Sequence, residues 1–433
     1  MTEYIQVGFT KTSAYDLNPS HFQLDGTTIS VSGAFNSGET FPTSPVVSQL
    51  FLHTPTGRKI LYQYDGSAWR ALASLGPMTL YVDKTNGTDD LNYGHGTTTS
   101  AFQTVAYAVT FSQIPSRNDY NVTINLTGEE YNESVYIVGA QTNIYINGQF
   151  STVDSLTATG GSAGTATAAP YVSGTFSANA YNQKLIKFTS GVNNGLTYIV
   201  GQTTTTAIYF SPSPLTPLVA APANGDTYLI LDWATTIYKL WVQNSPCLVA
   251  CANISFTTPG PFGTVYNFRG ASNLVNCKSA TNGAVSTYVN DNAYTQAINS
   301  LFVSTSNVAV YIIDALYAGG NCDISGGLIA GYGSGSNNMG IRAALNGGAI
   351  VRGVEITGCV WGVYSDSGGY IDYFTRGLYS FIHGNATYGS RATGGSSKII
   401  HNSYVVYGKK LDGSADANGT DSSANATSFS WIG

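Results

Sequence analysis

A degenerate repeat near the C-terminal end of the chain limits the folds that this sequence can adopt. Its copies begin at Gly340 (GIRAALNGGAIV), Gly362 (GVYSDSGGYID) and Gly389 (GSRATGGSSKI), at intervals of 22 and 27 residues. Repeats of this length, rich in Gly, Ser, Asn and short β-branched runs, are typical of a solenoid with one coil per repeat. The copies lack the Leu spacing of leucine-rich repeats and the helical periodicity of ankyrin or tetratricopeptide units. The sequence therefore predicts a parallel β-helix.

The composition favours an almost purely β protein. The 433 residues include 49 Gly and 30 Tyr but only 18 Lys+Arg and 24 Asp+Glu. Thr, Ser, Val, Ile, Tyr and Asn replace the charged helix formers, and this set favours strands and tight turns. The charged fraction of 10% lies far below the usual value of about 25%. A net charge of −6 argues against a general nucleic-acid binder, which needs a basic stripe.

The chain shows neither a membrane segment nor a secretion signal. No stretch reaches the ~18 consecutive apolar residues of a membrane helix, and the N-terminus lacks a basic region followed by an apolar core. We therefore expect no membrane insertion, synthesis in a bacterial cytoplasm and release by another route, such as lysis by a virus. The five cysteines have no CxxC pair. We expect buried, reduced thiols inside successive coils, with no metal and no cofactor.

Turn signals and changes in composition divide the chain. Asp25-Gly26 predicts an early hairpin, and the turns at Thr56-Gly57 and Asp65-Gly66 predict a second β unit. Helical spacing within 101–114 predicts a short helix that caps the coil. The predicted division is an N-terminal virion-attachment module and linker (1–47), a β-hairpin module (48–76), the start of the β-helix with its capping helix (77–150), an inserted small β-domain (151–234), the β-helix continued (235–408) and a C-terminal tail (409–433).

Three groups of residues resemble known protein families. These are VDKTNGTDD, AFQTVAYAV and VTINL…ESVYI within 82–137, the hairpin FLHTPTGRKILYQYDGSAW at 51–69, and GVYSDSGGYIDY…GNATYGSRATGGSS within 362–397. The first resembles the start of pectin-lyase-like right-handed β-helices, the second a hairpin of phage tail proteins, and the third the coils of phage tail fibres and tailspikes. The resemblance covers roughly residues 48–150 and 235–405. It implies a right-handed single-stranded parallel β-helix and a homotrimeric virion appendage, whose N-terminal module attaches to other virion proteins.

Acidic residues are the candidates for catalysis, since glycosidases use paired carboxyl groups. Weak candidates are Asp366, Asp372 and Glu355, with Asp314 and Asp323 on an earlier coil and Arg352 beside Glu355. Arg342, Tyr364 and Arg391 share the second position after the repeat glycine, so we expect them to stack along one face. The alternative interpretation assigns Asp366 to turn hydrogen bonding, Asp372 and Glu355 to exposed ion pairs with arginines, and Glu129, Glu130 and Glu133 to a solvated corner.

Aromatic residues give a second set of candidates. Five of them crowd two consecutive coils, namely Trp361, Tyr364, Tyr370, Tyr373 and Tyr379. Aromatic side chains with a polar tip suit sugar stacking and protein interfaces. The set predicts either glycan binding or packing between the subunits of a trimer.

Three functional hypotheses follow. The first is a phage tail spike or fibre for host attachment that binds a bacterial surface polysaccharide without cutting it, favoured because no acidic group stands out. The second is a polysaccharide depolymerase, a glycoside hydrolase or lyase of the same fold. The third is a capsid surface decoration protein. The sequence does not identify the glycan or the host.

Overall fold

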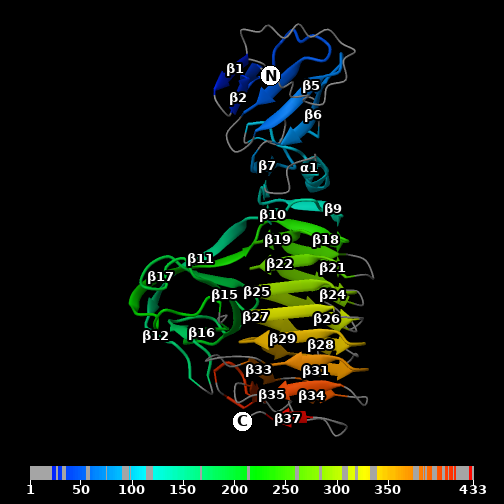
Figure 1. The fold of residues 1–433 in the computed structure, drawn as a ribbon. Helices are drawn as coiled ribbons and strands as arrows, with labels where there is room; N and C mark the ends of the chain where they lie inside the picture. The colour runs from blue at the N-terminus through cyan, green and yellow to red at the C-terminus, as the bar shows by residue number, and fades with distance from the viewer. Residues whose placement is uncertain are drawn as a thin grey trace.

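The computed structural model is almost entirely β, with a long stack of parallel strands that carries a seven-stranded sheet on one side (Figure 1). Two small groups of strands precede the stack. In the part of the chain that the structure describes, no helix is long and apolar enough to cross a membrane. The structure describes residues 22–431 except for 26–27, 32–35, 55–58, 75, 90–96, 98, 114–119, 166–167, 212–214, 259–262, 282–284, 305–310, 317–319, 332–338, 374–379, 384, 386–387, 393–396, 402–404, 408, 413 and 416–428.

The predicted N-terminal hairpins are confirmed. One is the antiparallel pair β1 (Phe22–Asp25) and β2 (Thr28–Val31). The second unit is a sheet of four strands, β3 (Asn36–Gly38), β4 (Leu50–His53), β5 (Ile60–Tyr64) and β6 (Trp69–Ser74). Strands β4, β5 and β6 pair antiparallel, while β3 pairs parallel with β4. This sheet therefore includes residues on both sides of the boundary expected at residue 47.

The long stack is one sheet of 24 strands arranged in three columns of parallel pairs. The first column contains β7 (Met78–Val82), β8 (Val122–Leu126), β10 (Ile144–Asn147), β19 (Leu248–Ala252), β22 (Ala271–Val275), β25 (Tyr294–Ser304), β27 (Asn321–Ala330), β29 (Gly348–Arg352), β32 (Tyr370–Asp372), β35 (Lys398–His401) and β37 (Phe429–Trp431). The second contains β20 (Ser255–Thr258), β23 (Lys278–Thr281), β30 (Glu355–Thr357), β33 (Ser380–His383), β36 (Val405–Tyr407) and the C-terminal parts of β25 and β27. The third contains β9 (Glu130–Val138), β18 (Thr236–Gln243), β21 (Val265–Phe268), β24 (Val285–Asn290), β26 (Tyr311–Leu316), β28 (Met339–Ala344), β31 (Trp361–Asp366) and β34 (Tyr388–Ala392).

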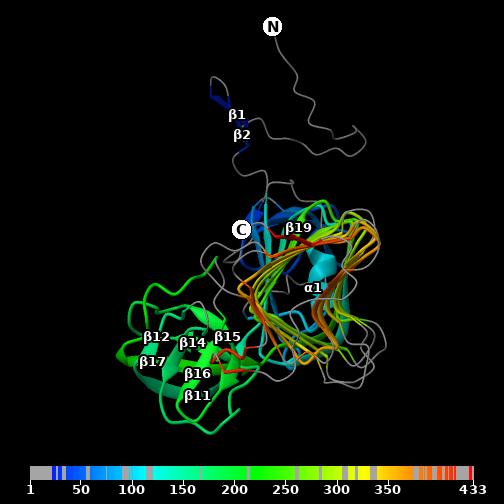
Figure 2. The ribbon, with the colours of Figure 1, turned by 90° about the horizontal axis from the view of Figure 1, so that it is seen from below.

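From β19 to β36 the chain passes through the first, second and third columns in that order, again and again. In the view of Figure 2 the stacked strands superimpose, while the seven-stranded sheet lies to one side. The predicted repeat is confirmed, because its copies form the consecutive third-column strands β28, β31 and β34.

The repeat glycines are required by the close approach of these strands. A Cβ atom added to Gly340 would lie 2.3 Å from the carbonyl oxygen of Gly362, and one added to Gly362 would lie 2.6 Å from that of Gly389. Both distances are far below van der Waals contact. Glycine at these positions therefore lets the three strands stack.

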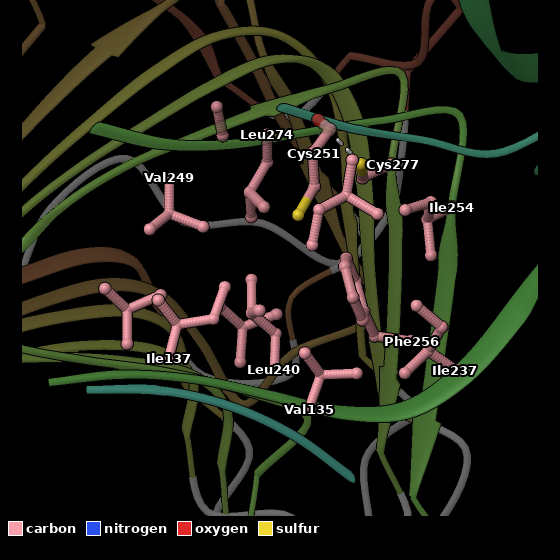
Figure 3. Close-up of a cluster of buried hydrophobic side chains, with 14 of the residues drawn as sticks. Val135, Ile137, Ile237, Leu240, Val249, Cys251, Ile254, Phe256, Leu274 and Cys277 are labelled. Atoms are coloured by element: carbon pink, nitrogen blue, oxygen red, sulfur yellow. Dashed lines mark hydrogen bonds between the residues drawn. The ribbon is translucent and has the colours of Figure 1, made fainter. Parts of the chain in front are cut away.

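Apolar side chains from the three columns fill the space between them. Figure 3 shows Val135, Leu240, Val249, Leu274 and Phe256 in this core. Four of the five cysteines are buried and all five are free thiols, as predicted. The Cys277 thiol donates to the carbonyl oxygen of Cys251 on β19 at 3.4 Å.

The short predicted helix is confirmed as α1 (Val105–Ser112), which begins after the N-cap Thr104. The Thr104 side chain accepts the Tyr107 N–H. Glu133 is not in a solvated corner, because its carboxylate accepts the backbone N–H groups of Val105 and Ala106 at 2.8 and 2.9 Å. Glu133 thus binds the free N–H groups at the positive end of the helix dipole.

The seven-stranded sheet is formed by the segment between β10 and β18. Its strands are β11 (Phe150–Thr159), β12 (Gly161–Ser162), β13 (Tyr171–Ser173), β14 (Leu185–Phe188), β15 (Thr197–Thr203), β16 (Ala207–Phe210) and β17 (Asn224–Trp233), all paired antiparallel. One face has a core of its own, which includes Phe188, Tyr198 and Phe210. Side chains such as Ile199, Leu231 and Trp233 pack on outward residues of the second column, including Leu301 and Leu328. We name this group the side sheet.

We expect Gly362→Ala to destabilise the stack, because the added Cβ would overlap the Gly389 carbonyl. Overpacking of this kind costs about 1–3 kcal/mol. Urea unfolding monitored by circular dichroism measures the loss. Gly38→Ala is the matched control, since the nearest atom to its added Cβ is Phe51 Cζ at an ordinary 3.7 Å. Equal stability of the two variants would contradict this account of the repeat.

Candidate functional site

A continuous row of residues follows the third column. The residues occupy equivalent register positions on consecutive strands, and in order they are Tyr136, Trp241, Tyr266, Tyr288, Asp314, Arg342, Tyr364 and Arg391. We call this set the outer row. The predicted stack of Arg342, Tyr364 and Arg391 is confirmed as its last part.

The alternation of strands directs the outer row away from the core. Residues on either side of Trp241, namely Leu240 and Val242, are fully buried, and Ile313 and Ala315 flank Asp314 in the same way. Successive side chains of a strand point to opposite faces, so the described side chains of the row lie on the outward face. Neighbouring strands are about 4.8 Å apart, which puts consecutive members of the row within reach of one ligand.

The first part of the row is an aromatic stack. The rings of Trp241 and Tyr266 are 4.7 Å apart and nearly parallel, at 9°. Tyr136 lies 6.1 Å from Trp241 and is 57% exposed. The Lys239 ammonium lies 5.1 Å from the Trp241 ring centre and 4.8 Å from that of Tyr266, which are cation–π distances. This part of the row offers flat apolar faces beside a positive charge.

The second part of the row centres on Arg342. Its guanidinium contacts Asp366 at 3.2 Å and Asp314 at 3.8 Å, and it lies 4.6 Å from the ring centre of Tyr311. One oxygen of each carboxyl group, Oδ1 of Asp314 and of Asp366, is buried without a hydrogen-bond partner among the described residues. We call Asp314, Arg342 and Asp366 the carboxylate–arginine cluster. It places two carboxyl groups with spare acceptor oxygens on one guanidinium.

The two carboxyl groups differ in environment. Burial raises the pKa of Asp314 to about 7, against the lowering effect of Arg342 and with a further raising effect from Asp366. The side chain of Asp314 is 3% exposed and that of Asp366 is 16% exposed. A carboxyl group that stays protonated near neutral pH is able to donate a proton. The interpretation of the Asp366 side chain as a turn acceptor is wrong. The turn uses the backbone carbonyl of Asp366, which accepts the Gly369 N–H, while the side chain binds Arg342.

The structure separates the three catalytic candidates Asp366, Asp372 and Glu355. They lie on strands of the third, first and second columns respectively. Glu355 is 3% exposed, and its Oε1 lies 2.8 Å from His383 Nε2. The side sheet covers it, because a Cβ added to Gly201 would overlap Glu355 Oε2. The expected exposed ion pair between Glu355 and Arg352 is therefore wrong.

Arg352 instead pairs with Asp323 on the first column, at 3.2 Å. The Tyr294 hydroxyl is 3.5 Å from the same carboxylate oxygen of Asp323. Burial raises the pKa of Asp323, and Arg352 lowers it. Asp372 lies in the same register line as Asp323, and it accepts the Tyr370 hydroxyl at 3.0 Å. The arginine expected to pair with Asp372 is Arg376, which lies outside the described residues.

The predicted glycan-binding aromatics fall in two places. Trp361 and Tyr364 lie together, with ring centres 5.0 Å apart, and Arg391 lies 4.6 Å from the Trp361 ring centre. Tyr370 is 37% exposed on the first column. Tyr373 is 1% exposed and belongs to the core, so its ring does not reach a surface. Tyr379 lies outside the described residues.

The candidates selected from the sequence do not include Tyr136, Trp241 and Tyr266, which form the aromatic stack. Its signal is a large side chain between two core residues, as in VYI, LWV and VYN. Such triplets recur as IDA, IRA and VYS at Asp314, Arg342 and Tyr364. Aligning these triplets along the third column would have identified the whole row.

Comparison with known proteins gives weak structural likenesses. No family model matches the chain, and no curated protein matches it. A complex of XylC with xylose is 11% identical with a TM-score of 0.33, covering 81% of this chain and 71% of that one. A glycoside hydrolase is 10% identical with a TM-score of 0.25, covering 76% and 88%. The gp54 tailspike of Acinetobacter baumannii bacteriophage AP22, in complex with capsular saccharide, is 8% identical with a TM-score of 0.18, covering 71% and 64%.

The raised pKa of Asp314 gives a stability that depends on pH. The native carboxyl keeps its proton up to about pH 7, whereas the unfolded one loses it near pH 3.9. The folded state therefore binds more protons between these values, and its stability falls as pH rises from about 4 to 7, by up to ~4 kcal/mol. Urea unfolding across this range should show a smaller fall for Asp314→Asn than for the wild type.

Asp291→Asn is the control for this measurement, because Asp291 forms a surface ion pair with Arg269. It should retain the pH dependence of the wild type. If Asp314→Asn and Asp291→Asn give the same dependence, Asp314 does not titrate near neutral pH in the folded protein.

Proposed function

We propose that the chain is a phage virion protein of the tail spike or fibre class that binds a bacterial surface polysaccharide along the outer row. The single observation that carries this proposal is the Trp241–Tyr266 stack, continued in register by charged and aromatic residues. Flat aromatic faces accept the apolar faces of sugar rings, while the amphipathic tips of Tyr and Trp suit a wet surface. A linear polymer matches a linear row.

The proposal includes the architecture that this role needs. The three columns close into a right-handed single-stranded β-helix, three copies form a homotrimer, and the N-terminal module attaches to other virion proteins. The repeated passage through three parallel columns supports closure, because each passage brings the chain back to the first column, where the new strand pairs with the one that began the passage. The side sheet is the inserted domain of this β-helix, and its own core supports that assignment. The protein is made in the host cytoplasm and carried on the virion.

The aromatic stack provides the first test. We expect Trp241→Ala and Tyr266→Ala to weaken glycan binding roughly tenfold or more each, as truncation of a central aromatic contact does. An array of bacterial capsular polysaccharides and lipopolysaccharides, probed with purified full-length protein, measures binding.

Tyr171→Ala is the matched control, because the Tyr171–Tyr209 ring pair, 5.1 Å apart, lies on the side sheet. It should bind as the wild type does. Binding that survives loss of both Trp241 and Tyr266 would exclude the outer row as the glycan site. Wild-type protein that binds no glycan on the array would instead point to an architectural role, such as capsid decoration.

A second candidate function, depolymerisation of the bound glycan, is favoured by the carboxylate–arginine cluster. The neutral carboxyl of Asp314 would donate a proton to the leaving oxygen, and the carboxylate of Asp366 would act as base or nucleophile. Arg342, which contacts both, would position the two groups. Asp372 and Glu355 have no part in this mechanism, because they lie on other columns.

Sizing of the bound glycan after incubation tests this candidate. We expect Asp314→Asn and Asp366→Asn each to lower cleavage about 100-fold or more, the usual effect of losing a general acid or base. Cleavage should also fall as pH rises above about 7, since Asp314 then loses the proton that it donates. Asp372→Asn should cut normally. A glycan that the wild type binds but leaves intact would exclude depolymerisation and leave the binding proposal standing.

A further inference from the structure

The part of the stack from β18 to β35 differs in charge from the rest of the chain. Residues 235–401 contain eight Lys and Arg but six Asp and Glu, although acidic residues exceed basic ones over the whole chain by 24 to 18. The segments that connect the strands of this region at 259–262, 282–284, 305–310, 317–319, 332–338 and 374–379 contain no acidic residue. The negative net charge of the protein therefore arises elsewhere.

Most acidic residues of this region are engaged away from the outer row. Asp291 pairs with Arg269, Asp323 with Arg352, and Glu355 with His383, while Asp372 accepts the Tyr370 hydroxyl. The remaining two, Asp314 and Asp366, both contact Arg342. Burial also holds the pKa of Asp314 near 7, so this carboxyl carries only part of its charge at neutral pH. The acids of the row therefore offset little more than Arg342 itself.

Two further cations are Lys239, which lies beside the row on β18, and Arg391, the last member of the row. Lys239 lies over the rings of Trp241 and Tyr266, and Arg391 lies over the ring of Trp361. Six strand spacings separate β18 from β34, which is roughly 29 Å at about 4.8 Å each. Both cations lie beside an aromatic face, so a bound sugar ring would have its substituents next to a positive charge.

We infer that the polysaccharide bound along the outer row is acidic, with carboxylate-bearing sugars at the Lys239 and Arg391 ends. This inference rests on the proposed function, because it names the class of glycan for the same surface. Sugar rings would stack on Trp241, Tyr266 and Trp361, while the two cations bind the charged substituents. The middle of the bound polysaccharide segment, which carries no charge, would lie over the carboxylate–arginine cluster.

A single-stranded nucleic acid also combines flat rings with negative charges, but it fits this surface less well. Proteins that bind one follow its backbone with a continuous basic groove. Here Lys239, Arg342 and Arg391 face two carboxyl groups over the same length. A polymer with sparse negative charges matches this spacing better than one with a charge on every unit.

The test uses the same array, with each glycan printed beside its carboxyl-reduced form, which keeps the backbone and removes the charge. We expect the bound glycans to be acidic, their reduced forms to bind at least about fivefold more weakly, and binding to weaken as salt is raised. Equal binding of reduced forms, or binding to neutral glycans alone, would overturn the inference but not the proposed function. Binding of no glycan at all would overturn both. Tighter binding to a single-stranded oligothymidylate would assign the row to nucleic acid.

Variants of Lys239 and Arg391 test whether the preference for acidic glycans arises from these two charges. The double variant Lys239→Gln/Arg391→Gln should bind acidic glycans at least about fivefold more weakly and lose most of the salt dependence. Lys239→Arg/Arg391→Lys keeps both charges and should bind nearly as the wild type does, which separates loss of charge from loss of folding. Lys187→Gln, at an exposed position of the side sheet, is the control for net charge. An equal effect of Lys187→Gln would show that net charge alone, and not the row, attracts the glycan.

Discussion

In-register pairing of parallel strands determines the positions of all other groups in this protein. Each third-column strand pairs residue for residue with the next, from β18 to β34. The backbones approach so closely at Gly340 and Gly362 that no Cβ fits. Side chains at equivalent positions are therefore held about 4.8 Å apart. A residue type that recurs once per repeat becomes a continuous line on the surface.

The same constraint gives the outward faces of the columns different chemistry. Outward residues of the second column, such as Leu301 and Leu328, are apolar and pack against the side sheet. Glu355 and His383 are polar exceptions on that face, and they bind each other. On the third column the outward line is aromatic and charged, and Tyr136 at its start is 57% exposed. The face covered by protein and the face available to a ligand are thus set by which residues recur at which register position.

The sequence predicted the parts of this arrangement that depend on local periodicity. Glycine spacing was enough to predict the parallel stack and the line of Arg342, Tyr364 and Arg391, which the register confirms. Contacts between distant segments were not predictable. Glu355 is buried because the side sheet, about 150 residues earlier in the chain, lies over it. Arg352 pairs with Asp323 on the neighbouring strand of the first column rather than with Glu355, its neighbour in sequence. Trp241 and Tyr136 lie on adjacent strands, but the whole side sheet lies between them in the sequence. No short repeat therefore relates them.

Stacking in register also limits which charges a row can hold. Two like charges on neighbouring strands would lie within about 5 Å and repel each other, whereas the row places Asp314 beside Arg342 and separates Arg342 from Arg391 by Tyr364. Core packing does not require this order, because the side chains concerned point away from the core. Arg342 stabilises two carboxyl groups that burial would otherwise leave uncompensated, yet one buried oxygen of each has no hydrogen-bond partner among the described residues. Unsatisfied acceptors of this kind cost stability, and a bound ligand that donates hydrogen bonds to them would offset that cost.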